Sequence, residues 1–293
     1  MPDTNSTELI MLPFENFMGS TGLFFRIGPG IILKAPVKMG FDQIVRKRDT
    51  VEHHYIVEKQ ILDRLGTHPR IVKSVAHCTM GFLLYLHRVL RFLGSYTEFP
   101  TGLLFAEASY GSLQKFLYER ASEITPILRQ KWFVQAIESI EFIHSKGVMH
   151  SDLRPDNFLV DCTLSQSLDL RLCDFGGSTC EDLQLSGGTL PDSGFHNPND
   201  AWEPTYAADI FSLGSVLYTI MTGHWPFRST TGQWTSIEEM TEYNAKVDRC
   251  FADGIFPEVE GLFGGEIITG CWTNKFSDAA EIMASVSQFG IKY

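Results

Sequence analysis

The pattern of apolar and polar positions predicts strands near the start of the chain and a helix after them. Two short apolar segments, residues 23–27 and 31–34, flank Gly28-Pro29-Gly30, which is the signature of a β-hairpin. Residues 50–65 instead carry apolar side chains at helical spacing, until a glycine and a proline close the segment. We therefore expect a strand hairpin followed by a helix.

The rest of the chain predicts mainly helices. Residues 101–108 form an apolar strand that opens into a polar stretch, and residues 127–143 carry the broad apolar stripe of a core helix. A second hairpin is expected between residues 158–160 and 170–173. Further helices are expected in residues 208–217, 238–251 and 266–286.

Composition and charge narrow the choice of partners. With 293 residues, 44% of them apolar, the chain can bury a large core as one big domain or two lobes. Its net charge of −11 is uneven, with +3 in residues 1–105 and −14 in residues 106–293. An acidic second half disfavours nucleic acid and membranes as partners and favours a basic protein substrate. A charged surface that serves only solubility explains the charge equally well.

The sequence carries no recognisable targeting signal. Residues 1–13 are polar and lack the basic cluster and apolar run of a signal peptide. The most apolar stretch, residues 81–93, is only thirteen residues long and holds three basic side chains, so it is too short for a membrane span. The six cysteines have no metal-ligand spacing and indicate free thiols. We expect a soluble monomer of the cytoplasm or nucleus.

The strongest chemical signal is the octet His150-Ser151-Asp152-Leu153-Arg154-Pro155-Asp156-Asn157, which reads H-x-D-x-x-x-x-N. Asp174-Phe175-Gly176 follows it, and a strand lysine (Lys34) and a helix glutamate (Glu58) precede it. Each motif is common alone, but this order resembles the protein kinase superfamily, serine/threonine type. In its compact size and loop sequence the chain is also similar to small kinases of filamentous fungi.

The resemblance implies an α+β, two-lobed protein kinase fold with a small lobe of β-sheet plus one helix and a larger, mainly helical lobe. Residues 1–13 would be a tail, residues 14–105 the small lobe and residues 106–293 the large lobe of one kinase domain. The implied reaction is transfer of the γ-phosphoryl group of ATP to Ser or Thr hydroxyls of a protein substrate, with Mg²⁺ as the metal.

The resemblance also implies roles for the residues of the octet. Asp152 would orient the substrate hydroxyl and accept its proton, while Asn157 and Asp174 would be the metal ligands. Arg154 stands where serine/threonine kinases carry a lysine, so a positive charge beside the γ-phosphate is kept. The implied catalytic residues are Lys34, Glu58, Asp152, Arg154, Asn157 and Asp174.

On the nucleotide side, Glu58 would hold Lys34 against the α- and β-phosphates. Phe105 would be the gatekeeper, with the backbone of residues 106–108 facing adenine. The glycine loop at residues 19–22 is shortened, and taken alone it fits a plain turn better than a phosphate-binding loop. The implied nucleotide-binding residues are Gly19, Ser20, Thr21, Gly22, Phe24, Ile32, Lys34, Phe105, Ala106, Glu107, Ala108 and Leu159.

Several positions depart from the family pattern. Ser151 replaces the arginine that anchors a phosphorylated activation loop, so we predict a non-RD kinase whose activity does not depend on that phosphorylation. The A-P-E motif is missing, and its arginine partner is absent from residues 271–276. Gly188-Thr189 still resembles a serine/threonine-type substrate platform.

Residues 73–90 look like an eighteen-residue insert in the small lobe. Three explanations stay open, namely a genuine embellishment, an amphipathic docking helix around residues 82–93, and translated intron sequence. Two other functions stay open as well. The degraded glycine loop allows a pseudokinase or nucleotide-binding scaffold, and H-x-D-x-x-x-x-N occurs in aminoglycoside-kinase-like enzymes. Residues 208–217 resemble a kinase αF helix, which those small-molecule enzymes lack.

Overall fold

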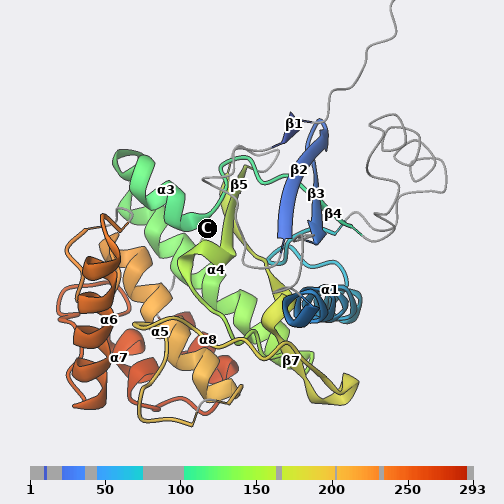
Figure 1. Cartoon of the computed structure of the whole chain (residues 1–293). Coiled ribbons are helices and arrows are strands. Elements are labelled where there is room, and N and C mark those ends of the chain that lie inside the picture. The colour runs from blue at the N-terminus through green and yellow to red at the C-terminus, as the bar shows by residue number, and fades with distance from the viewer. Residues whose placement is uncertain are drawn as a thin grey trace, which may run out of the picture.

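The computed structural model describes residues 10–11, 22–36, 45–74, 102–162, 167–201, 203–230 and 234–288. These residues form a small antiparallel sheet with one long helix and a larger, mainly helical part (Figure 1). Helices and strands segregated in this way confirm the predicted α+β class with two lobes. The exact boundaries of the tail and of each lobe stay predictions.

The small sheet follows the order β1-β2-β3-β4. Its strands are β1 (Ile10–Met11), β2 (Gly22–Gly28), β3 (Ile31–Pro36) and β4 (Leu103–Ala106). The predicted hairpin is β2 with β3, and Gly30 in its turn takes a positive φ of 71°, which a glycine adopts without strain. The β3–β4 register places Ile32 opposite Phe105 and Lys34 opposite Leu103. Because side chains alternate along a strand, Ile32 and Lys34 share one face.

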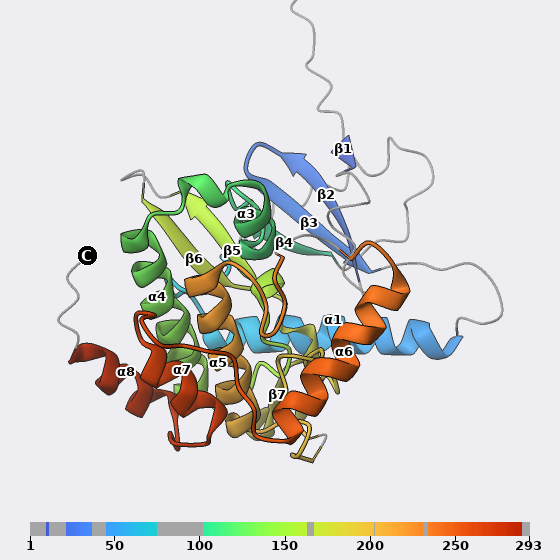
Figure 2. The same cartoon turned by 90° about the vertical axis from the view of Figure 1, so that its left-hand side faces the viewer.

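Helix α1 (Val45–Leu65) lies beside this sheet, as both views show (Figures 1 and 2). The predicted helix is confirmed, although it begins at Val45 rather than at residue 50. Val57 and Ile61 point into the core and are fully buried. Gly66 then takes a positive φ of 64° and ends the helix, as glycine commonly does at this position.

The large lobe is built around two central helices, α4 (Pro126–Ser145) and α5 (Tyr206–Thr222). Thr125 and Thr205 cap them by accepting hydrogen bonds from backbone N–H groups of the first turns. Helix α5 buries most of its side chains, and α4 buries the broad apolar face that its sequence pattern predicted. The other elements are α3 (Leu113–Glu119), β5 (Phe158–Cys162), β6 (Leu168–Leu172), β7 (Thr179–Cys180), β8 (Leu185–Ser186), α6 (Ile237–Ala252), α7 (Gly265–Trp272) and α8 (Ala279–Ser287).

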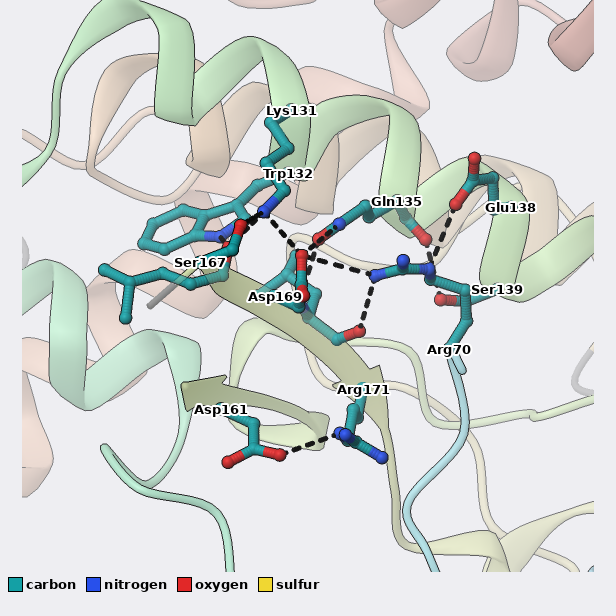
Figure 3. Close-up of polar contacts among 12 residues, drawn as sticks. Arg70, Lys131, Trp132, Gln135, Glu138, Ser139, Asp161, Ser167, Asp169 and Arg171 are labelled. Atoms are coloured by element: carbon teal, nitrogen blue, oxygen red, sulfur yellow. Dashed lines mark hydrogen bonds and ion pairs between the residues drawn. The ribbon is translucent and has the colours of Figure 1, made fainter. Parts of the chain in front are cut away.

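A polar network ties the β5–β6 hairpin to α4 (Figure 3). Asp169 of β6 accepts a hydrogen bond from Gln135 at 2.7 Å and forms an ion pair with Lys131. Arg70, from the loop after α1, reaches Glu138 of α4 at 3.1 Å, and the backbone of the same loop bonds to Leu172. This network fixes the hairpin from which Asn157 and Asp174 emerge, and it joins the loop after the small-lobe helix to the large lobe.

The two described residues of the possible insert continue the small sheet. The amide of Ala106 donates to the carbonyl of Lys73 at 2.9 Å, and Ser74 forms an isolated bridge with Phe105. The rest of residues 73–90 lies outside the described residues, so the three explanations stay open. Within the described part of the chain, the helices are all too short or too polar to cross a bilayer.

Candidate active site

The octet lies in a loop whose backbone is held by one buried carboxylate, Asp209 of α5. Its two oxygens accept hydrogen bonds from the amides of His150 at 2.7 Å and Ser151 at 2.9 Å. Ser151 has a φ of 68°, a left-handed conformation that side-chain-bearing residues rarely adopt. Asp209 also contacts Nε2 of His144 at 3.0 Å. The predicted helix of residues 208–217 therefore sets the shape of the loop.

Asp152 and Asn157 face each other inside this loop. The Asn157 amide nitrogen donates to the backbone carbonyl of Asp152 at 2.7 Å and to its carboxylate at 3.2 Å. Burial raises the pKa of Asp152 to about 7, and the nearby Asp174 and Asp192 add to the rise while Arg154 opposes it. A carboxylate with a pKa near neutrality suits a general base.

Lys34 lies between two carboxylates from distant parts of the chain. Its ammonium donates to Glu58 of α1 at 2.7 Å and to Asp174, after β6, at 2.8 Å. Burial disfavours the charged form, but Asp174 and then Glu58 outweigh it, so the pKa of Lys34 is raised. Lys34 in turn lowers the pKa of Asp174. Burial pushes the pKa of Glu58 upward against the effect of Lys34, and the short contact supports an ionised pair.

Asn157 and Asp174 are brought together by backbone contacts. The amide of Cys173 donates to the carbonyl of Asn157 at 2.9 Å, which places the chain entering Asp174 beside Asn157. The amide nitrogen of Asn157 is already donating, so its oxygen is the atom left to meet a cation. Carboxylate and amide oxygens are ligands that Mg²⁺ prefers, and a site with few protein ligands suits an ion that keeps waters and substrate phosphates. These two residues fit the predicted metal.

Arg154 has partners that the sequence did not predict. Its guanidinium forms an ion pair with Asp192, and a second carboxylate, Asp156, lies 3.7 Å from its Nε. Asp192 is 38 residues away along the chain, and no motif marks it. The positive charge that the sequence predicted near Asp152 is therefore present at Arg154, but Asp156 and Asp192 balance it in this structure.

The structure also places several of the predicted nucleotide-binding residues. Ile32 and Phe105 face each other across β3 and β4, and the ring of Phe24 on β2 lies 5.9 Å from the Lys34 ammonium. Glu107 is held by Arg26, whose Nε lies 3.0 Å from both carboxylate oxygens. Gly22 is the first residue of β2, whereas Gly19, Ser20 and Thr21 lie outside the described residues. Ala106 ends β4, Ala108 is half-buried in the loop after it, and Leu159 on β5 bridges Ser112.

The fold and the arrangement of this site are those of a kinase-like protein. The family profile described as protein kinase domain matches residues 39–260, and the chain belongs to this family. Protein kinases use ATP and a divalent metal ion in general. The match begins after Lys34, so the contacts of Lys34 with Glu58 and Asp174 add a residue that lies outside the matched range.

Curated relatives agree with this family. The CBL-interacting serine/threonine-protein kinase 20 of Arabidopsis thaliana is 27% identical over 179 residues, which cover 59% of this chain and 39% of the relative. Ribosomal protein S6 kinase alpha-3 of Homo sapiens is 34% identical over 196 residues, covering 62% of this chain and 22% of the relative. The chain thus matches well under half the length of these relatives.

Proposed function

We propose that this chain is an ATP-dependent protein kinase that phosphorylates Ser or Thr hydroxyls of a protein substrate. The observation that carries the proposal is the position of Lys34, bonded at once to Glu58 and to Asp174. A lysine held in this way presents a fixed positive charge to phosphate oxygens, and such preorganised charge is the main contribution that a protein makes to phosphoryl transfer.

Each residue of the loop has a part in the proposed reaction. Asp152 orients the substrate hydroxyl and accepts its proton, and Asn157 keeps the Asp152 carboxylate in place through its amide nitrogen. Asn157 and Asp174 would hold Mg²⁺, which supplies charge neutralisation at the phosphates when bound. Arg154, whose charge acts on Asp152, would meet the transferred group if a bound substrate drew it from Asp192.

The serine/threonine preference rests on two observations. The basic residue Arg154 precedes Pro155, and Gly188-Thr189 resembles the platform of serine/threonine kinases. The Arabidopsis thaliana relative is itself named a serine/threonine-protein kinase. The likeness to compact fungal kinases stays a prediction supported by the octet and the D-F-G turn.

A basic protein substrate is the finer part of the proposal. The side chains of Asp156 and Asp192 are 37% and 55% exposed, and both lie beside Arg154 close to Asp152. Two carboxylates around one guanidinium leave negative charge for a substrate cation. Ser112 stands where kinases that prefer basic peptides often carry an acid, so a peptide array decides the point. A monomer in the cytoplasm or nucleus is likewise proposed, and gel filtration and imaging of a tagged protein test it.

Incubation with Mg²⁺, labelled ATP and a protein substrate tests the function. We expect transfer to Ser or Thr, and a fall of about 100-fold or more in the Asp152→Asn variant with nucleotide binding retained. Asp63→Asn is the matched control, because Asp63 is an exposed partner of Lys59 far from the loop. Nucleotide binding without transfer would support the scaffold instead, and phosphorylation of an aminoglycoside but no protein would support the small-molecule kinase.

A further inference from the structure

Two neighbouring histidines of α1 contact the backbone of residues 176–192, which we call the activation segment. Nε2 of His53 lies 2.7 Å from the carbonyl oxygen of Ser186, and Nε2 of His54 lies 2.7 Å from that of Gly187. A carbonyl oxygen can only accept a hydrogen bond, so both Nε2 atoms donate. One turn of helix α1 therefore engages two successive peptide groups of the segment.

The segment packs against the D-F-G turn without space for a side chain. A Cβ atom added to Gly187 would lie 2.2 Å from the carbonyl oxygen of Gly176 and 2.5 Å from Cα of Gly177. A Cβ atom on Gly176 would in turn lie 3.4 Å from Cβ of His54. The amide of Gly187 also donates to the carbonyl of Ser178 at 2.9 Å. Helix, turn and segment are thus in direct contact, and a shift of one requires a shift of the others.

The same helix carries the glutamate of the site. His54 and Glu58 are four residues apart, so they lie on one side of α1. Glu58 fixes the helix to Lys34 and, through it, to Asp174, while His53 and His54 fix the helix to the segment that follows Asp174. The position of α1 is therefore set at two places, by Lys34 and Asp174 at the start of the D-F-G turn and by the activation segment that follows the turn.

These contacts need no modified side chain. Both acceptors are main-chain carbonyls, which are present whatever side chain the segment carries. The hydroxyl of Ser178 is buried and donates to the carbonyl of His150 at 3.1 Å, so that side chain is already engaged within the fold. Ser151 occupies the position where many kinases carry the arginine that binds a segment phosphate, and its short neutral side chain offers no such charge.

We propose that His53 and His54 are positioning residues that hold the activation segment and α1 in the catalytically competent arrangement. They do so by binding main-chain carbonyls of the segment, and so replace the arginine that binds a segment phosphate in many kinases. The role in catalysis rests on the proposed kinase function. The contact itself does not, because it is a property of the folded chain and can be measured without phosphoryl transfer.

The test uses the full chain with three variants. His53→Ala combined with His54→Ala is expected to lower kcat about tenfold, with a smaller change in the KM for ATP. The reason is that each lost hydrogen bond shifts the equilibrium between the held and the released activation segment by a few-fold. Amide hydrogen exchange of Thr179 and Gly187, which donate to Met149 and Ser178, is expected to accelerate. A double glutamine variant restores a donor at both positions and is expected to recover most of kcat and of the protection. Lys59→Ala, on the exposed side of α1, should match wild type.

The readouts separate the two proposals. An alanine pair with wild-type kcat and wild-type exchange would overturn the positioning role, and so would a loss that the glutamine pair leaves unrestored. If the wild-type chain transfers no phosphate, the exchange data still decide whether the histidines hold the segment. Faster exchange in the alanine pair then supports the proposal that the two histidines hold the segment, whereas unchanged exchange overturns it.

Discussion

The catalytic loop and the activation segment are neighbours that are held in opposite ways. The loop is supported from inside by Asp209, which is 1% exposed and accepts two backbone amides. The segment has a buried contact at Ser178, but its later part is also held by more exposed ones, those of His53 with Ser186 and of Asp192 with Arg154. Buried polar contacts are costly to break, whereas exposed ones exchange with water at little cost. The loop is therefore expected to keep one conformation, whereas the exposed part of the segment can rearrange at a lower cost in free energy.

The largest effect is expected from Asp209→Ala. The substitution leaves the buried amides of His150 and Ser151 without an acceptor, and each such donor costs about 1 to 3 kcal/mol, so we expect a loss of about 2 to 6 kcal/mol in the free energy of unfolding. Urea unfolding followed by circular dichroism measures it, with Asp63→Ala as the exposed control. A loss below about 1 kcal/mol would contradict the inside support of the loop.

Lys34→Met is expected to remove catalysis while keeping the segment in place. Without the ammonium, the phosphates lose a preorganised charge, and kcat/KM should fall on the order of 100-fold or more. Hydrogen exchange of the segment should stay near wild type, because His53 and His54 still bind its carbonyls. Loss of protection in the segment would show that the contacts of Lys34 with Glu58 and Asp174 support the segment as well.

The pH dependence of kcat/KM tests the loop directly. Asp152 acts as the carboxylate, and its pKa is raised to about 7, so activity should be full above that pH and be lost as the pH falls through it. Well below the midpoint, about a tenfold loss per pH unit is expected for a single essential base. A profile that is flat between pH 5.5 and 8, roughly the span over which such a base would titrate, would exclude Asp152 as the base.

Asp192→Asn should move that profile modestly. Asp192 is one of the groups that raise the pKa of Asp152, and its loss also frees Arg154 from one of its two other carboxylate partners. Both changes favour the carboxylate form of Asp152, so the acid limb of the profile should shift to lower pH. Asp200→Asn, at an exposed position further along the chain, serves as the control. A shift of the acid limb toward higher pH would mean that Asp192 and its ion pair with Arg154 do not raise the pKa of Asp152.

The smallest effect is expected from removing phosphate. Because the segment is held through carbonyls and Ser151 offers no anchor for a phosphate, phosphatase treatment of the purified protein should leave the rate within about twofold. Mass spectrometry before and after treatment verifies that any phosphate has been removed. Abolished activity would show that a modified side chain, and not the main chain, orders the segment.

The sequence predicted what depends on local pattern or on an ordered set of motifs. The β2–β3 hairpin, the core helix α4 and the loop with Asp152 and Asn157 each carry such a signal, and Lys34 meets Glu58 as expected. Asp174 was predicted to lie beside Asn157, but its contact with Lys34, 140 residues away along the chain, was not predicted.

The remaining contacts left no signal in the sequence. Asp192 is one acidic residue among many until the fold brings it to Arg154, and His53 and His54 read as ordinary polar positions on a helix. Their partners are backbone carbonyls, which every residue has, so no side-chain pattern records the contact. The start of α1 at Val45 was missed because the apolar spacing begins only after that point.

Cys173 gives the site a property of its own. The thiol stands directly before Asp174, and burial, with Asp174 adding to it, raises its pKa well above the ordinary range. Only the ionised thiolate reacts readily with oxidants and electrophiles. A reactive thiolate beside Asp174, which we propose as a metal ligand, would make the site sensitive to peroxide. The raised pKa of Cys173 instead favours a thiol that reacts slowly with oxidants and with cysteine-directed inhibitors.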